Sequence, residues 1–445
     1  MTLHRLISLT TLSLSLIASA FAQSPPSGAI PSTAFGMHLG SAQAWPGNDT
    51  LGRPPTFGYL GKSGEVGWGY IQCSSGGPGS TPPAYNWTRL DNWVALASSH
   101  SMKGMYAFYN GTPCWATPSG SACTVTYGCN MSSGALPTES LLVTFTTALV
   151  QRYQTNYPGV LDYELFNEPE NEITNFPSSG TVVSKFVTLM TDEYNIIRAD
   201  SSSSTISSPS FVTAAGISAY YTAGGPTGID VVSHHFEPGG CQVDRIFGSE
   251  YLTGVYAANN TAGVGSKPLL DTETSSLCTS YAANEQFVMQ DYLLQWSLGT
   301  SRLNWYEWYA PTSDYFSMYD GTTVYIDATG YNTLQDWLVG ATMSSSCSST
   351  SAIYSGGTFV DNAVWSCPFV LGSGSQGSAV WTSSNYSGST SYIVPSPFNQ
   401  YVDSNNTVHS SPIGSSVTIS ATPILLQVAS GAPAPPGLSI FGVHR

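Results

Sequence analysis

The sequence predicts a (β/α)8 barrel followed by a small β-sandwich, on three observations. Short apolar segments alternate with helix-like segments from Phe35 to Tyr309. Glu168 and Glu273 each follow a strand-like run, at the place where that strand would end. After Trp337 the helical periodicity gives way to short β-prone runs that Gly, Ser, Asn and Pro separate. Alternating strands and helices favour a parallel sheet, and a closed barrel gathers the carboxyl ends of its strands at one face.

Eight barrel strands are expected where β-branched, aromatic and other apolar residues form short runs. In chain order these runs are Phe35–His38, Val66–Cys73, Gly104–Phe108, Leu161–Phe166, Ser204–Ser208, Ile229–Ser233, Pro268–Thr272 and Arg302–Trp308. An open doubly wound sheet is the alternative. It would carry a Gly-rich phosphate turn after its first strand, and the segment from Gly36 to Gly40 does not supply one.

The helices between the strands are expected from apolar residues spaced by about 3.6 positions. This pattern indicates helices at 90–97, 139–153, 182–199 and 287–298. The second of these follows Pro137 and Thr138, which is a typical helix start.

The C-terminal region has the pattern of a small β-sandwich. Its β-prone runs lie at 359–360, 363–365, 379–381, 392–394, 417–419 and 423–426. Their regular aromatic and β-branched content favours a sandwich over a disordered linker. We therefore expect a catalytic barrel at 23–337, an accessory sandwich at 338–427 and a flexible tail at 428–445.

The N-terminus has the features of a secretory signal peptide. His4 and Arg5 precede an apolar stretch from Leu6 to Ala18, and the small residues Ala20 and Ala22 follow. A membrane anchor is the alternative, but the stretch is short for a bilayer and rich in Ser and Thr. We expect cleavage after residue 22 and a secreted mature protein that does not bind membranes.

The charge of the chain limits its partners. Charged residues make up only 9% of the chain, the formal net charge is −15, and aromatic residues are abundant. An acidic surface repels polyanions, so nucleic acid and acidic glycans are poor partners. A neutral oligo- or polysaccharide fits better, while the oligomeric state is left open.

The eight cysteines predict disulfides, because an even number is typical of secreted chains. Neighbours along the chain suggest the pairs Cys123–Cys129, Cys241–Cys278, Cys347–Cys367 and, by remainder, Cys73–Cys114, although sequence alone does not fix them. No CxxC pair or His-rich spacing accompanies them, so we expect no metal and no other cofactor. Sequons that would make a eukaryotic chain a glycoprotein, and would be chance in a bacterium, occur at Asn48, Asn86, Asn110, Asn130, Asn259, Asn385 and Asn405.

Glu168 and Glu273 are the candidate catalytic residues. Two carboxyls that face each other across a cleft can cleave a glycosidic bond, one as acid/base and the other as nucleophile. Glu168 lies between Asn167 and Pro169 at the end of the fourth strand, and Glu273 ends the seventh. As the acid, Glu168 is expected to have a raised pKa beside an ionised Glu273.

Five further side chains are candidates for sugar binding. His235 ends the sixth strand, where an imidazole can reach a carboxylate or a sugar. Tyr306 and Trp308 share one side at the end of the eighth strand, and an aromatic ring there can pack on a sugar. Trp115, after the third strand, is a candidate for the rim, and Asn167 for a hydroxyl contact. The nearby carboxylates Glu164, Glu170 and Glu237 have less favourable positions and are assigned no role.

These residues resemble clan A of the glycoside hydrolases, which has Asn-Glu at strand four and Glu at strand seven of a (β/α)8 barrel. Family 39, which includes β-xylosidase-like enzymes, is the most similar family. The segments 85–91 and 112–115, the strand-six His, the strand-eight Trp-Tyr-Glu-Trp and the appended sandwich resemble its layout.

The resemblance implies Glu168 as acid/base, Glu273 as nucleophile, and Asn167, His235 and Trp308 as sugar contacts. It also implies a retaining hydrolase that cleaves a neutral glycan by double displacement. Many clan members carry Arg at the end of strand two, and the segment 70–73 offers none. Many place Tyr two residues after the strand-six His, where this chain has Glu237, so Tyr306 is the candidate for that hydroxyl. A transglycosylase and an inactive glycan-binding barrel are the alternative functions.

Overall fold

A computed structural model describes residues 24–429 except 41–43, 64–65, 109–110, 127, 238–239, 248–250, 311–314, 344, 351–353, 356–357, 360–362 and 384–387. The expected signal peptide at 1–22 and nearly all of the expected tail at 428–445 lie outside this part of the chain.

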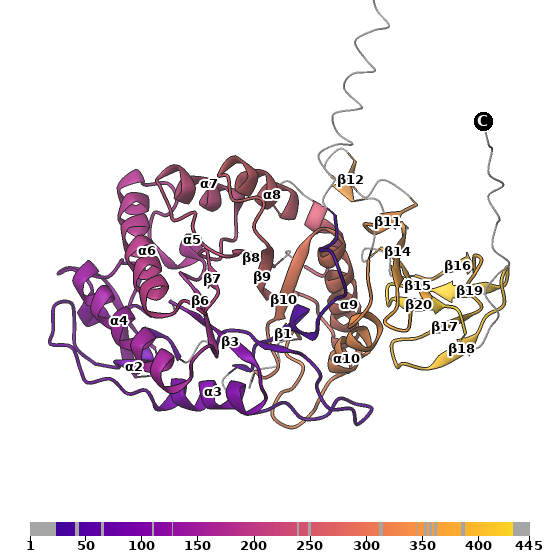
Figure 1. Cartoon of the computed structure of the whole chain (residues 1–445), viewed down its shortest axis with the longest axis horizontal. Coiled ribbons are helices and arrows are strands. Elements are labelled where there is room, and N and C mark those ends of the chain that lie inside the picture. The colour runs from indigo at the N-terminus through magenta and orange to yellow at the C-terminus, as the bar shows by residue number, and fades with distance from the viewer. Residues whose placement is uncertain are drawn as a thin grey trace, which may run out of the picture.

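The first domain is a closed barrel of eight parallel strands (Figure 1). The strands are β1 (Phe35–Met37), β2 (Tyr59–Leu60), β3 (Lys103–Ala107), β6 (Leu161–Glu164), β7 (Ile206–Ser207), β8 (Val232–Phe236), β9 (Leu269–Thr274) and β10 (Thr300–Trp305). They pair in chain order, β1 pairs with β10, and a parallel bridge between Ser207 and Val231 closes the remaining seam. The predicted (β/α)8 barrel is therefore confirmed.

Helices surround this barrel and bury their apolar faces against it. They are α3 (Thr88–Ser99), α4 (Glu139–Asn156), α6 (Gly180–Asp200), α7 (Ala214–Thr222), α8 (Leu252–Thr261), α9 (Tyr281–Ser297) and α10 (Ile326–Leu338). The four helices predicted from periodicity correspond to α3, α4, α6 and α9.

The second barrel strand is not where the sequence pattern placed it. The segment expected as a strand, 66–73, contains the short helix α2 (Trp68–Ile71), and the strand is Tyr59–Leu60. A strand of two residues has no alternation to detect, whereas Trp68 and Ile71 are both buried at helical spacing. Gly61 follows the strand because a Cβ there would lie 2.3 Å from Cδ2 of His38. This shift changes which residue stands at the end of strand two.

The second domain is a β-sandwich, as predicted. One sheet contains β11 (Ser348–Ser349), β14 (Val364–Val370), β15 (Gln376–Thr382), β20 (Ile424–Gln427), β17 (Gln400–Val402) and β18 (Val408–Ser410). A second pair, β16 (Thr390–Ile393) with β19 (Ser416–Ile419), encloses an apolar cluster that includes Val380, Val417 and Leu426. β12 (Tyr354–Ser355) and β13 (Thr358–Phe359) form a separate hairpin. The expected domain boundary at 337/338 stays a prediction.

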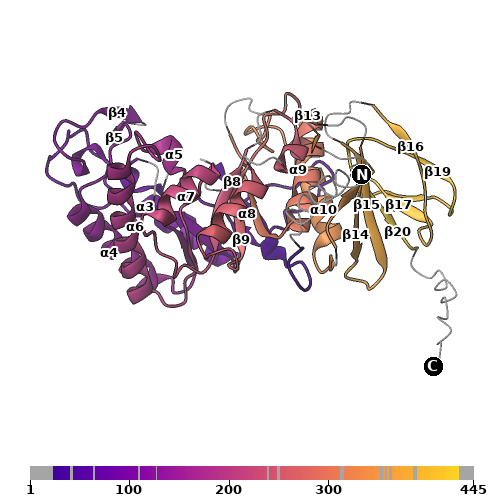
Figure 2. The ribbon, with the colours of Figure 1, turned by 90° about the horizontal axis from the view of Figure 1, so that it is seen from above.

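The sandwich packs on the barrel through α9 and α10, which lie between the two domains in both views (Figures 1 and 2). Nε2 of Gln290 on α9 donates to the carbonyl of Ala421, and Oγ1 of Thr333 on α10 donates to that of Ser404. Trp365 of β14 stacks on Phe247 of the barrel domain with ring centroids 5.4 Å apart. The two domains therefore share one continuous apolar core.

Four disulfides join the eight cysteines. Cys241–Cys278 and Cys347–Cys367 were predicted correctly. The other two pairs are Cys73–Cys129 and Cys114–Cys123, so the expected Cys123–Cys129 and Cys73–Cys114 pairs are wrong. The hairpin of β4 (Cys123–Thr126) and β5 (Cys129–Ser132) exchanges the partners, because it brings Cys129 to Cys73 and Cys123 to Cys114. One of the sequons, Asn259, is 3% exposed and so has no room for a glycan. None of the helices in the described ranges combines the length and the apolarity needed to cross a bilayer.

Several carboxyl groups are buried in this core, and Asp291 shows how they are accommodated. Thr274 Oγ1 lies 2.9 Å from Oδ2 of Asp291 and 3.1 Å from the carbonyl oxygen of Phe236. A hydroxyl has one proton, so Thr274 can donate fully to only one of these oxygens, and a neutral Asp291 can donate its own proton to Thr274. Burial raises the pKa of Asp291 to about 7, in agreement with this arrangement. Burial also raises the pKa values of Asp244, Glu285, Glu193, Asp271 and Asp327.

These raised pKa values predict a fold that is more stable in acid. Between about pH 4 and pH 7 the folded chain holds protons that the unfolded chain has released, so stability falls as pH rises through this window. We expect a lower Tm at pH 7.5 than at pH 4.5 by differential scanning calorimetry. Asp291→Asn, whose amide donates as the neutral acid does, should raise Tm at pH 7.5 and reduce the difference. The exposed Glu139→Gln is the control, and an unchanged difference in Asp291→Asn would contradict the assignment.

Candidate active site

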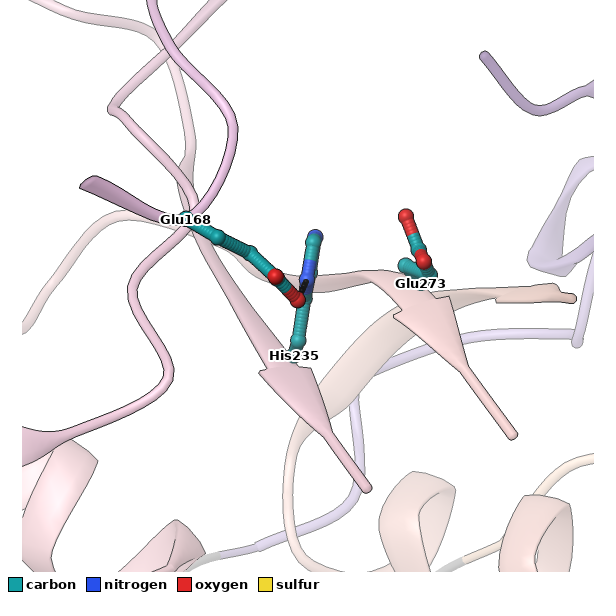
Figure 3. A group of neighbouring side chains, drawn as sticks. All are labelled: Glu168, His235 and Glu273. Atoms are coloured by element: carbon teal, nitrogen blue, oxygen red, sulfur yellow. Dashed lines mark hydrogen bonds and ion pairs between the residues drawn. The ribbon is translucent and has the colours of Figure 1, made fainter. Parts of the chain in front are cut away.

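Glu168, His235 and Glu273 meet at the carboxyl end of the barrel, from three different strands (Figure 3). One carboxylate oxygen of each glutamate and one ring nitrogen of His235 lie within 4.8 Å of one another. Glu168 and Glu273 therefore lie close together, as their predicted positions at the ends of strands four and seven implied.

Glu168 is aimed into the site by an unusual backbone conformation. Its amide donates to the carbonyl of Ser210 after β7, and the residue then adopts the left-handed region, with φ 45° and ψ 59°. Non-glycine residues adopt this region rarely, and it is found where a side chain must be held in a particular direction. Pro169 then starts the short helix α5 (Pro169–Glu172) and leads the chain away.

A bulge in β9 aims Glu273. His234 pairs with Asp271 and the next residue, His235, pairs with Glu273, so Thr272 is the extra residue of this strand. Without it, strict alternation would place Asp271 and Glu273 on the same face. Instead, Asp271 accepts from Gln295 of α9 on the outside, while Glu273 contacts Lys62.

Lys62 is the centre of the site, and the sequence patterns did not identify it. The residue follows β2, is 4% exposed, and its Nζ lies 2.9 Å from Oε2 of Glu273 and 2.9 Å from Nε2 of His235. The same ammonium donates to Oδ1 of Asn167 and lies 3.4 Å from Oε1 of Glu164. The segment 70–73, which offers no Arg, is not the end of strand two, because the strand itself had been misplaced, and Lys62 supplies a cation after the actual strand.

The surrounding charges keep Lys62 and Glu273 ionised. Burial alone lowers the pKa of Lys62, but the charges of Glu164, Glu273 and Glu168 outweigh it and raise that pKa. Burial alone raises the pKa of Glu273, but the positive charges of Lys62 and His235 lower it. Glu273 is thus a buried carboxylate with one firm counter-charge.

The pKa of Glu168 is lowered, which contradicts the expectation that it is raised. Burial by itself raises it, yet the hydrogen bond from Nδ1 of His235 at 2.6 Å, with the charge of that ring, lowers the pKa to about 2. Burial and the charge of Lys62 lower the pKa of His235, whereas the hydrogen bond to Glu168 and the charges of Glu273 and Glu168 raise it. The net effect is a raised pKa of His235. When Nε2 accepts from Lys62, the ring carries its proton on Nδ1 and is neutral. The positive charge that lowers the pKa values of the two glutamates is present when the ring is protonated on both nitrogens.

Two further buried side chains complete the site. Nε2 of His38, one residue past β1, lies 2.9 Å from the carbonyl oxygen of Thr272 and so donates to it. Burial lowers the pKa of His38 to about 4, which keeps the ring neutral. Glu164, which had been set aside, accepts from Oγ of Ser210 at 2.9 Å as well as from Lys62. The position of Glu164 at the end of β6, with its side chain directed into the barrel, could have indicated that it belongs to the site.

The aromatic candidates differ in their placement. Tyr306 is half-buried and meets the ring of His38 edge-on, with centroids 5.4 Å apart. Trp308 is 5% exposed, and its backbone amide donates to the carbonyl of His38, so it lies beside the site. Trp115 does not form a rim. It is 2% exposed, packs on Trp68, and donates its indole N–H to the carbonyl of Gln72.

The trio of Glu168, His235 and Glu273 also has the donor types of a metal site. Lys62 argues against that use, because its ammonium already stands 2.9 Å from both His235 and Glu273. A divalent cation there would face a buried positive charge. The donor set therefore suits acid–base chemistry better than metal binding.

Comparison with known proteins supports the fold. No family model matches the chain, and no curated protein is significantly similar to it. A GH39 β-xylosidase from Caulobacter crescentus has a TM-score of 0.55 at 11% identity, over 91% of this chain and 97% of that chain. The GH39 enzyme from Xanthomonas axonopodis pv. citri gives 0.54 at 14%, over 91% and 97%. The catalytic domain of the GH30 xylanase C from Talaromyces cellulolyticus gives 0.53 at 15%, over 92% and 99%. The resemblance to the clan A barrel is thus confirmed as a likeness of fold.

The position of Lys62 leads to a prediction about stability. Lys62→Met should lower Tm by several degrees at pH 7, because removing one partner of a buried ion pair costs about 3–5 kcal/mol. At pH 4 the loss should be smaller, because Glu273 without Lys62 has a raised pKa and is protonated there. Calorimetry at both pH values measures this, with the exposed Lys185→Met as control. An equal loss at both pH values would indicate lost packing alone.

Proposed function

We propose that this chain is a secreted retaining glycoside hydrolase that acts on a neutral glycan, with Glu168 as acid/base and Glu273 as nucleophile. The observation that carries the proposal is the approach of the two carboxylates, whose facing oxygens lie within 4.8 Å. Retaining glycosidases hold their carboxyl groups about 5–5.5 Å apart, whereas inverting ones leave about 6.5–9.5 Å for a water. The short separation supports double displacement.

In the first step a carboxylate oxygen of Glu273 attacks the anomeric carbon while Glu168 gives a proton to the departing glycosidic oxygen. The carbon–oxygen bond breaks, and a covalent glycosyl ester on Glu273 remains. In the second step Glu168 removes a proton from water, the water oxygen attacks the same carbon, and Glu273 leaves as the carboxylate. The charge of Lys62 stabilises the free carboxylate of Glu273. This carboxylate is the nucleophile of the first step and the leaving group of the second.

The first step needs a proton that Glu168 does not hold in this structure. The Glu168–His235 pair must therefore take up a proton before cleavage, and the pair titrates as a unit. The resemblance to clan A supports Asn167 and His235 as contacts for sugar hydroxyls, and Tyr306 and Trp308 as aromatic borders of the sugar. Secretion is supported by four disulfides, which persist in oxidising compartments.

The roles of the two glutamates are tested by their variants. Glu273→Ala should lose essentially all activity on aryl glycosides. Glu168→Ala should keep activity best with good leaving groups, which need no protonation, and azide should partly restore it. Proton NMR of the first-formed product should show retained configuration. An inverted product, or equal loss across leaving groups in Glu168→Ala, would contradict the assignment.

The shared proton predicts the pH profile. The alkaline limb of kcat/KM should follow the Glu168–His235 pair, because cleavage needs that pair protonated. His235→Gln removes the imidazole and leaves a carboxyl to titrate alone, so the limb should move to lower pH. His409→Gln is the matched control, because its Nε2 lies 2.8 Å from a carboxylate oxygen of Asp403 in the sandwich. An unmoved limb in His235→Gln would assign the proton elsewhere.

A further inference from the structure

A cluster of tyrosines lies at the surface of the barrel domain, separate from the residues described above. Tyr281 and Tyr325 stack face to face, with centroids 3.4 Å apart and planes 8° apart. Tyr315 meets Tyr281 edge-on at 5.1 Å and keeps 40% of its surface exposed. The other two rings are half-exposed. Tyrosines that only served the core would be covered more fully.

The topology places this cluster on the same face as the active site. Tyr281 is the first residue of α9, which follows β9, and Tyr325 immediately precedes α10, which follows β10. The helix after each barrel strand begins at the carboxyl end of that strand. Since Glu273 lies on β9, the tyrosines and the candidate nucleophile share one end of the barrel.

Ring contacts connect the cluster to the site. His38 meets Tyr306 at 5.4 Å, and Tyr306 meets Phe316 at 5.6 Å. Phe316 is the neighbour of Tyr315 in the chain, and its carbonyl accepts from the indole of Trp305 on β10. An aromatic path thus leads from the site outward to the exposed rings.

The cluster is held in place before any ligand binds. Tyr325 donates its hydroxyl to Oδ2 of Asp320 at 2.6 Å, and Oδ1 of Asp320 accepts from the backbone of Thr322 and Thr323. The Cys241–Cys278 disulfide anchors the loop before Tyr281. Prearranged rings lose little entropy when a ligand packs on them.

We propose that Tyr281, Tyr315 and Tyr325 form a platform that binds a neutral polysaccharide chain beyond the bond that is cleaved, so that the enzyme acts on a polymer. The proposal deepens the proposed function and rests on it. Sugar rings present C–H faces that pack on aromatic rings, and the platform continues the path from the site. Arginines lie over the rings of Trp87, Tyr194, Tyr251 and Tyr59, which are not part of the platform. With Asp320 at its edge, the platform disfavours an acidic polymer.

Binding is measured first, without cleavage. The full chain with Glu273→Gln is run in affinity gels that contain arabinoxylan, mixed-linkage β-glucan, galactomannan or polygalacturonate. We expect retardation by at least one neutral polymer and none by polygalacturonate. Tyr281→Ala and Tyr325→Ala should each raise the Kd about tenfold, as loss of a ring-stacking contact does. Tyr281→Phe should stay within about twofold. Tyr157→Ala, at the end of α4 on the opposite face of the barrel, is the matched control.

Turnover is measured next, in the active chain. The Ala variants should lower kcat/KM on the polymer about tenfold through KM, while hydrolysis of a small aryl glycoside should change less than twofold. Equal retardation of the Tyr variants and their parent, or a parent that no neutral polymer retards, would overturn the proposal. Failure of the proposed function has a different result: the Glu273→Gln chain binds polymer through the tyrosines, but the chain with Glu273 intact hydrolyses no glycoside.

Discussion

The site depends on one buried cation. Lys62 is surrounded by Glu273, Glu164, Asn167 and His235, and it is the only lysine or arginine that the described contacts place among them. A carboxylate in a low-dielectric interior takes up a proton unless a positive charge stabilises it. Asp271 and Glu273 show the difference. Asp271 is buried and Glu273 partly buried on β9, but the pKa of Asp271, which accepts from Gln295, is raised, while that of Glu273 beside Lys62 is lowered. The candidate nucleophile is therefore ionised because of Lys62.

The remaining buried acids follow from the same reasoning. Burial raises the pKa values of Asp291, Asp327 and Glu193, which favours their neutral forms. Because these acids are neutral at low pH, the fold is more stable in acidic conditions. An acidic medium also suits the Glu168–His235 pair, which needs a proton before it can act as an acid. An acidic pH therefore favours both the stability of the fold, through the buried acids, and the protonation of the Glu168–His235 pair.

The sequence was sufficient to predict the barrel, the sandwich and the proximity of Glu168 and Glu273, because the alternation of segments and the ends of strands can be recognised in a single sequence. The sequence did not predict features that span very few residues or that depend on contacts between residues distant in the chain. The two-residue β2 has no period, so Lys62 could not be placed at a strand end. The bulge at Thr272 is visible only in the pairing of β9, and the hairpin that exchanges two disulfides only in the fold. Trp115 is a different case. Its position after the third strand could be read from the sequence, but the packing that buries its side chain could not.

The discovery of Lys62 also changes the reason for expecting a neutral sugar. The sequence supported a neutral sugar through the acidic net charge of the chain, and it showed no Arg in the segment expected to end strand two. An ammonium has three N–H donors, however, and four acceptors already lie around this one: Oε2 of Glu273, Nε2 of His235, Oδ1 of Asn167 and Oε1 of Glu164. A sugar carboxylate would have to displace one of these partners, and it would bring a further negative charge beside Glu168 and Glu273. A hydroxyl brings no such charge and can exchange with one acceptor at a time. The cation at the centre of the site is therefore occupied by protein acceptors, which supports the proposal of a neutral substrate.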